Sequence, residues 1–357
     1  MADLFSAMKL GRLTLANRVV MAPMTRSRAM SDGTPTDAMA DYYRQRASAG
    51  LIVSEGIYPS EDGKGYCRTP GLVTDEHVAG WKKITDAVHG AGGTIVAQVM
   101  HCGRVGHMDN KQPGTELVSP SGLRARGDMF TDTAGMQPIS ETRALTLEEI
   151  PRVIEEFALS TARAYEAGFD GVELHCASGY LPAQFLSTGS NQRNDAYGGS
   201  LENRICFAVE ALDAMASVDG PDRVGFRICP GNPFNDLSDA DPVETFHAFL
   251  GAVRNKGLAY CHVIRLNSIP NAPDIDNVAL ANEAWGGALI ANDSYDLAEA
   301  TSAVGDGTAD AISFARSYIG NPDLVERFKA GADLAGFNPK QLYSEGPAGY
   351  SDYPALD

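Results

Sequence analysis

The sequence predicts a single α/β domain over residues 1–357, a (β/α)8 TIM barrel with a long lid-like excursion after the third strand. Three observations predict it: short apolar runs recur along the chain, helical patterns fill the gaps between them, and no change of composition marks a linker. Short, continuously apolar runs are typical of parallel strands covered on both faces. The alternative, a doubly wound α/β sheet, would be expected to carry a Gly-x-Gly-x-x-Gly turn after an early strand, and this chain has none. The barrel is therefore the better interpretation.

The strands expected for such a barrel are four or five residues long and mostly apolar. We expect them at 18–21, 51–54, 94–98, 171–174, 224–228, 260–264, 288–291 and 311–314.

The clearest helix signal lies between the third and fourth predicted strands. Thr146 and Glu149 form a capping-box pattern, in which the threonine hydroxyl and the glutamate carboxylate each accept from an exposed backbone N–H. Apolar residues then recur at helical spacing over 150–165, and Gly168 ends the pattern. Further helices are expected at 36–49, 75–91, 201–218, 242–256 and 295–304.

One segment breaks the alternation of strands and helices. Residues 108–143 are polar and rich in Gly, Pro, Ser and Thr, and they exceed the usual length of a loop between a strand and a helix. Because the segment follows the third strand, we expect it to lie over the catalytic face as a lid. The alternative is an irregular surface excursion.

Composition excludes several classes of function. With 44% apolar and 21% charged residues, the chain is typical of a soluble globular protein. A net charge of −17 argues against binding to nucleic acid or to anionic membranes. No apolar run approaches the ~20 residues of a membrane span, and the start lacks the pattern of a secretory signal, so we expect a cytoplasmic protein. The sequence does not choose between a monomer and a homodimer.

A metal site is not expected. His101, Cys102 and His107 lie close in sequence, but the first two are adjacent and no second pair of ligands accompanies them.

The most informative stretch surrounds the fourth predicted strand. His175, Ser178, Gly179 and Tyr180 follow the strand directly, where barrel enzymes carry their catalytic groups. An imidazole donor beside a phenol suits a reaction in which a carbonyl oxygen gains charge while a neighbouring carbon is protonated. The alternative is that His175 only caps the strand and that Tyr180 packs with its hydroxyl in water.

This stretch, together with motifs along nearly the whole chain, resembles the old yellow enzyme family of FMN-dependent ene-reductases. The other matching motifs are Met21–Arg26, Lys64–Tyr66, Gln98–Arg104, Gly225–Arg227, Phe314–Arg316 and Asn321–Leu324. In this order, they indicate both the barrel and the cofactor.

The resemblance implies an FMN site at the carboxyl ends of the strands. Thr25 would contact flavin O4, Gln98 the N3/O2 edge and Arg227 the N1/O2 edge. A fixed guanidinium near N1 would stabilise the anionic reduced flavin. The alternative for Thr25 and Gln98 is ordinary hydrogen bonding at a strand end. The remaining residues that match ring contacts are Pro23, Met24, Gly56 and His175.

At the phosphate end the chain departs from the family pattern. Where the family has Asn-Gly-Gly-Tyr-Asp and Phe-Gly-Arg, this chain has Asn292, Asp293 and Ser294 after the seventh strand and Ala315 before Arg316. Arg316 remains as the phosphate partner. Glycines let backbone amides approach an anion, and Asp293 adds a negative charge there, so we expect weaker FMN binding than is usual for the family.

At the reacting end the chain has Ser178 where the family carries Asn or His, and Met100 at a site that is often Trp. A serine hydroxyl is shorter than an amide, and losing one oxyanion donor typically costs about 10²–10³ in rate. The residues that match the substrate cavity are Tyr66, Phe234 and Tyr343, besides Met100. These bulky residues are equally suited to packing at the barrel top.

The activity implied is reduction of enones, enals, maleimides and nitroalkenes with NAD(P)H by ping-pong hydride transfer. Hydride would reach the β-carbon from the reduced flavin, and Tyr180 would protonate the α-carbon. Reduction of nitro-esters or nitroaromatics would be a side activity. Two alternatives stay open: a redox-neutral, isomerase-type flavoenzyme, favoured by Ser178 and Met100, and a non-catalytic barrel that binds flavin weakly, favoured by Asp293 and Ala315.

Overall fold

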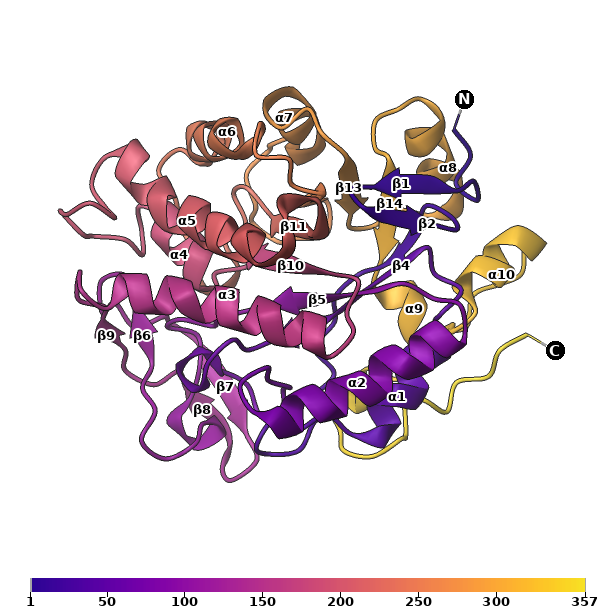
Figure 1. The fold of residues 1–357 in the computed structure, drawn as a ribbon, viewed down its shortest axis with the longest axis horizontal. Helices are drawn as coiled ribbons and strands as arrows, with labels where there is room; N and C mark the ends of the chain where they lie inside the picture. Colours follow the sequence, from indigo (N-terminus) through magenta and orange to yellow (C-terminus); the bar gives the residue numbers. More distant parts are fainter. Residues whose placement is uncertain (1, 357) are drawn as a thin grey trace.

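Within residues 2–356, which the computed structural model describes, eight parallel strands close into a barrel (Figure 1). Met1 and Asp357, the ends of the predicted domain, lie outside the described residues. The barrel strands are β3 (Val19–Met21), β4 (Leu51–Ile57), β5 (Ile95–Val99), β10 (Gly171–Cys176), β11 (Val224–Ile228), β12 (Tyr260–Ile264), β13 (Leu289–Asn292) and β14 (Ala311–Phe314). They follow one another around the barrel in chain order, and β14 pairs with β3 to close it. The predicted fold class is confirmed.

Helices alternate with the strands and surround the barrel (Figure 1). The helices are α1 (Asp37–Arg44), α2 (Asp75–Gly90), α3 (Ile150–Glu166), α4 (Leu181–Leu186), α5 (Leu201–Asp219), α6 (Pro242–Val253), α7 (Asn277–Ala284), α8 (Leu297–Gly305), α9 (Arg316–Gly320) and α10 (Leu324–Ala330). Several begin at side-chain caps: the Ser200 hydroxyl accepts from the Asn203 N–H, and the Asp241 carboxylate from the Glu244 N–H.

Sequence reasoning missed several short helices and overextended two, one of which, expected over 242–256, ends at Val253. The omitted helices are α4, α7, α9 and α10, none longer than eight residues. The helix expected over 36–49 ends at Arg44. Turns follow it because the Gly50 N–H must reach the Val19 carbonyl oxygen to begin pairing beside β3.

The capping box before α3 forms only in part. The Glu149 carboxylate accepts from the Thr146 N–H at 2.8 Å, as the pattern predicts. The helix itself begins at Ile150, and the Thr146 hydroxyl makes no hydrogen bond among the described residues. Glu149 instead holds Arg143 in an ion pair, and this guanidinium lowers the pKa of Glu149 to about 2.

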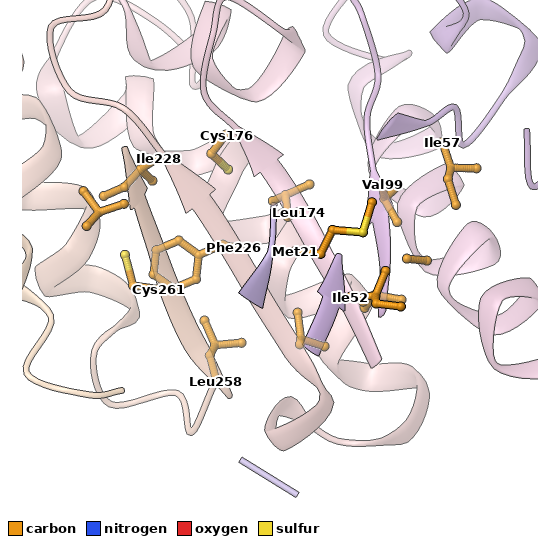
Figure 2. Close-up of a cluster of buried hydrophobic side chains, with 14 of the residues drawn as sticks. Met21, Ile52, Ile57, Val99, Leu174, Cys176, Phe226, Ile228, Leu258 and Cys261 are labelled. Carbon is orange, nitrogen blue, oxygen red and sulfur yellow. The ribbon is translucent and has the colours of Figure 1, made fainter. Parts of the chain in front are cut away.

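The larger apolar core lies between the barrel and the helices. Strand residues such as Leu174, Phe226 and Ile228 point outward and are fully buried against the helices (Figure 2). Burial of this kind of side chain contributes about 1.5–3 kcal/mol each.

A second, smaller core fills the lower interior of the barrel. It contains Val20, Val96, Tyr260 and Ile290 from barrel strands, together with leucines of an N-terminal hairpin, β1 (Met8–Leu10) and β2 (Leu13–Leu15). This hairpin packs against the end of the barrel opposite the predicted site.

The long segment after β5 is structured and is not an irregular excursion. It contains an antiparallel hairpin of β7 (Asp128–Thr131) and β8 (Gly135–Pro138), and a short pair of β6 (Val118–Ser119) and β9 (Arg143–Ala144).

Five 3-10 turns complete the described elements: η1 (Glu61–Gly63), η2 (Met108–Asn110), η3 (Pro221–Arg223), η4 (Phe234–Asp236) and η5 (Pro339–Gln341). None of the helices within residues 2–356 is long and apolar enough to cross a membrane.

Candidate active site

The register of the barrel brings the predicted residues to one end. His175 on β10 lies opposite Arg227 on β11, and Gln98 on β5 lies opposite Gly56 on β4. All four sit in the carboxyl-terminal part of their strands. Because parallel strands end at the same rim, they face the same space as the loops that follow.

His175 is a neutral hydrogen-bond donor. Its Nδ1 accepts from the Ala177 N–H at 3.2 Å, so the ring proton lies on Nε2. Burial, reinforced by Arg227, lowers the pKa of His175 to about 3. Within residues 2–356 the Nε2–H has no hydrogen-bond partner. This side chain therefore offers one fixed, uncharged donor, and its role beyond capping the strand stays a prediction.

Tyr180 lies beside this donor. Its ring packs edge-on against the His175 ring with centroids 4.7 Å apart, and its hydroxyl is 3.0 Å from the Tyr66 hydroxyl. Burial, together with Tyr66, raises the pKa of Tyr180 far above its ordinary value. Tyr180 is 7% exposed, so its phenol keeps its proton. The alternative interpretation placed this hydroxyl in bulk water, and the structure does not.

The turn between them is held by a residue that sequence reasoning missed. The Asn235 amide nitrogen donates to the Ser178 carbonyl oxygen at 2.7 Å. Gly179 has φ +80°, and a Cβ there would lie 2.7 Å from the Cβ of Asn235, so only glycine fits. Asn235 has φ 59°, a conformation that asparagine tolerates well. No sequence signal other than that tolerance distinguishes Asn235 from a loop asparagine.

Ser178 occupies the left-handed region, with φ 56°. It is half-buried, and its hydroxyl makes no hydrogen bond to the described part of the chain. Its role as the second donor beside His175 stays a prediction.

The segment 108–143 contributes to a small apolar cluster around the reacting residues. Met129 and Ile139 of that segment pack with Met100, Tyr66 and Tyr180. Met100 packs directly against Gly56. A Cβ at position 56 would lie only 2.5 Å from the methionine sulfur, so a side chain there would clash with Met100. The position of the segment agrees with a lid, and its action as a lid stays a prediction.

The other two predicted cavity residues lie at the rim. Phe234 and Tyr343 are 57% and 58% exposed. Arg68 donates to the Tyr343 carbonyl oxygen at 2.8 Å, and Arg26 and Arg28 donate to the neighbouring Leu342 carbonyl oxygen. Three arginines thus fix the C-terminal segment that carries Tyr343 to the barrel.

The barrel interior also contains a guanidinium, that of Arg227, with one buried N–H group unpaired among residues 2–356. Such a cation could bind the electron-rich edge of a ligand ring. Arg227 is buried, and its Nη2 donates to Asn292 Oδ1 at 2.5 Å. Its Nε is buried and has no hydrogen-bond partner among residues 2–356. A buried N–H without a partner is costly, so a ligand acceptor beside Arg227 is favoured. After β3, the residues Pro23, Met24 and Thr25 are only half-buried and thus remain accessible to a ligand.

Asn292 contributes to this end through Arg227. Its amide oxygen accepts from the guanidinium, and its Nδ2 donates to the Ser313 carbonyl oxygen at 2.9 Å. Both ends of the amide are therefore committed within the barrel, and direct contact of this side chain with a cofactor stays a prediction.

At the predicted phosphate end, two residues adopt the conformation of the glycines they replace. Asp293 has φ 86° and Ser294 has φ 57°. The Asp293 carboxylate accepts from the Ser268 N–H at 2.9 Å and from the Ser268 hydroxyl at 2.5 Å. The Asp293 carboxylate is thus hydrogen-bonded within the protein. From the sequence alone, we expected its negative charge to repel the FMN phosphate. Ala315 is half-buried, and Arg316 is exposed with no ion pair in the described chain.

Comparisons with known proteins agree with this arrangement. Residues 3–335 match the family model for the NADH:flavin oxidoreductase / NADH oxidase family. A probable flavin mononucleotide-dependent alkene reductase of Leishmania infantum is 41% identical over 350 residues, covering 97% of this chain and 95% of that protein.

Solved structures give the same result. A morphinone reductase in complex with tetrahydroNAD is 42% identical, with a TM-score of 0.94, covering 100% of this chain and 98% of that one. An old yellow enzyme homologue from Zymomonas mobilis is 37% identical, with a TM-score of 0.96, covering 99% and 100% of the two chains.

These matches confirm the expected family, enzyme class and cofactors, FMN with NAD(P)H as reductant. They argue against the non-catalytic alternative. The unpaired Arg227 Nε and the accessible loop after β3 fit such a cofactor. The chain therefore belongs to the NADH:flavin oxidoreductase / NADH oxidase family and is an FMN-dependent barrel enzyme of the old yellow enzyme type.

Proposed function

We propose that this enzyme reduces activated C=C bonds of small electron-poor alkenes, namely enones, enals, maleimides and nitroalkenes, with NAD(P)H. The observation that carries the proposal is the pairing of a neutral imidazole donor, His175 Nε2–H, with the protonated phenol of Tyr180 at ring contact. Reduction of such an alkene needs one donor for the oxygen that gains charge and one acid for the carbon beside it.

FMN, when bound, supplies the hydride. The chain would hold the cofactor through side chains at the strand ends and through backbone at the phosphate end. The residues proposed for this role are Pro23, Met24, Thr25, Gly56, Gln98, His175, Arg227, Asn292, Asp293, Ser294, Ala315 and Arg316.

His175 would hold the activating oxygen of the substrate. Because its Nδ1 is committed to the Ala177 N–H, the Nε2–H is directed without rotational freedom. A neutral donor with a low pKa keeps its hydrogen bond over the whole physiological pH range. Ser178, close by in the same turn, would add a second, weaker donor from its free hydroxyl.

Tyr180 would protonate the α-carbon. Its raised pKa means that the phenol releases the proton only to a strongly basic centre, which the carbon becomes after hydride addition at the β-position. The Tyr66 hydroxyl, 3.0 Å away, could donate to the phenolate that remains. The apolar cluster around Met100 and Met129 would exclude water from this step.

Ping-pong kinetics is part of the proposal, because nicotinamide and alkene would both have to reach the flavin beside His175 and Tyr180. The same donors would hold a nitro group, so reduction of nitro-esters or nitroaromatics is proposed as a side activity. A redox-neutral isomerase reaction is the second candidate. It is favoured by the Ser178 hydroxyl, which has no partner in residues 2–356 and could contact a substrate group other than a simple carbonyl.

The test is anaerobic reoxidation of the reduced holoenzyme. We expect cyclohexenone to reoxidise it at least about 10²-fold faster than free reduced FMN, given the usual contribution of a positioned acid. Cyclohexanone, which has the same carbonyl and no double bond, is the matched control and should not react. If the enone is recovered with its double bond moved and the flavin stays reduced, the isomerase candidate is correct instead.

A further inference from the structure

Four polar side chains form a hydrogen-bonded group inside the barrel, close to His175 and Arg227. They are Gln98, Glu173, His262 and Ser313, each at most 2% exposed. They come from β5, β10, β12 and β14 and form one chain of hydrogen bonds. Barrel interiors are usually packed with branched apolar side chains, and buried polar groups are costly unless they are paired. The rest of the barrel interior is apolar, as is usual for this fold. The four buried polar side chains are therefore an exception with a cost in stability, which a functional role would explain.

The hydrogen bonds fix the orientation of each group. Gln98 Nε2 donates to Glu173 Oε1 at 2.7 Å, and His262 Nδ1 lies 2.9 Å from Glu173 Oε2. A carboxylate only accepts, so Nδ1 carries the ring proton and Nε2 accepts from the Ser313 hydroxyl at 2.7 Å. The Gln98 amide nitrogen is thus turned toward Glu173. Its oxygen remains the free acceptor of this side chain.

Glu173 is also the buried counter-charge of Arg227. Burial would raise the pKa of Glu173, but His262, Arg227 and Gln98 together lower it below its ordinary value, so the carboxylate stays ionised. The Tyr260 phenol also faces Glu173, and burial together with Glu173 raises the pKa of Tyr260 well above its ordinary value. A cation and an anion therefore lie near each other in a low-dielectric interior, where charges interact more strongly than in water.

We propose that Glu173 is a positioning residue that sets the reduction potential of the bound flavin. It would set the potential by partly cancelling the positive field of Arg227, and it would separately support FMN affinity by fixing the amide of Gln98. The inference rests on the proposed roles of Gln98 and Arg227 at the flavin ring, and it goes beyond them because Glu173 is fully buried and would act only through those two residues.

The two effects of Glu173 act on different quantities. Reduction adds two electrons and one proton to give an anionic flavin, so the charge of Glu173 disfavours the reduced form selectively. The orientation of Gln98 affects the oxidised and reduced forms alike. Charge therefore alters the potential, and orientation alters the affinity.

The main experiment uses Glu173→Gln holoenzyme, titrated anaerobically with dithionite against a reference dye. Loss of the negative charge should shift the equilibrium toward reduced flavin by about tenfold, which is about 30 mV upward for a two-electron couple. Ser313→Ala is the matched control. It cuts the same network at its far end without changing charge, and its potential should match the parent's. A Glu173→Gln potential that equals that of Ser313→Ala, or falls below the parent's, would overturn the proposal.

Glu173→Asp separates charge from position and serves if the glutamine variant fails to fold. It retains the charge and withdraws the carboxylate from Gln98. We expect unchanged potential with FMN affinity weakened several-fold in both redox states, measured by fluorescence titration of the apoprotein and by the potential. Unchanged affinity would rule out the positioning of Gln98. No alkene is present in these measurements, so they stand apart from any failure of the proposed alkene reduction.

Discussion

The two ends of the site differ in how the chain builds them. At the reacting end, side chains carry the proposed chemistry: His175 and Tyr180 are buried, in contact, and fixed by hydrogen bonds. At the phosphate end, Asp293 and Ser294 retain the left-handed backbone that glycines would adopt. Such a conformation costs a non-glycine residue about 1–2 kcal/mol. At the reacting end, the proposed chemistry depends on which side chains are present. At the phosphate end, where backbone amides would bind the anion, it depends on the backbone conformation.

The largest expected effect tests the reacting end. Tyr180→Phe removes the proposed acid and leaves the ring packed against His175. Reoxidation by enones should slow by about 10²–10⁴-fold, because that is the usual contribution of general acid catalysis. Reduction by NAD(P)H should be nearly unchanged, since it needs no carbon protonation. Stopped-flow measurement of the two half-reactions checks this.

Nitro reduction supplies the control for the same variant. It also needs no carbon protonation, so it should suffer less than enone reduction. If both half-reactions of Tyr180→Phe fell equally, Tyr180 would be a structural residue and the reacting end would lose its acid.

The second effect tests the phosphate end. Arg316 is exposed and makes no ion pair in the described chain, so its guanidinium is free for an anion. Arg316→Ala should weaken FMN binding by about 1.5–3 kcal/mol, or roughly 10- to 150-fold. Fluorescence titration of the apoprotein with FMN measures this, and riboflavin, which lacks the phosphate, is the matched ligand. Equal losses for FMN and riboflavin would show that Arg316 does not contact the phosphate.

How much could be predicted from the sequence depends on the kind of feature. The eight barrel strands were predicted because each is a short, mostly apolar run between helical patterns. Motif residues such as His175 and Tyr180 were found because they lie at the end of a strand or just past it; the strand, expected to end at Leu174, extends to Cys176 and includes His175. The roles assigned to them stay predictions.

Features that depend on tertiary contacts were not predictable. Asn235 acts by reaching the Ser178 carbonyl oxygen in the loop of the neighbouring strand. Glu173 looks like one more residue of a buried strand until Gln98 and His262 are placed around it. The direction of the Asp293 carboxylate likewise depends on Ser268, which is distant in sequence.

The third prediction concerns Ser178, where the reacting end departs from the family pattern. Its φ of 56° is the conformation that asparagine tolerates best after glycine, so Ser178→Asn should be accepted by the backbone. The longer amide should supply the second donor beside His175 and raise turnover of simple cyclic enones about tenfold, roughly 1.4 kcal/mol of barrier. Steady-state kinetics with cyclohexenone measures this. Ser178→Ala should do little harm; if it abolishes turnover while the Asn variant gains nothing, the serine hydroxyl is itself a specific substrate contact.

The smallest effect is expected at Asp293, where two contributions oppose each other. Asp293→Gly removes a negative charge near the proposed phosphate site and lets the backbone amide approach an anion more closely, and both changes favour FMN binding. It also releases the loop at Ser268, whose N–H and hydroxyl both bond the carboxylate. Contributions of roughly 0.5–1 kcal/mol on each side should leave FMN affinity within about threefold of the parent. Ser268→Ala is the matched variant, because it loosens the same loop while the charge remains, and it should bind FMN more weakly than Asp293→Gly. If Asp293→Gly instead tightens FMN more than tenfold, the charge governs this end, and side-chain identity constrains the phosphate end as it does the reacting end.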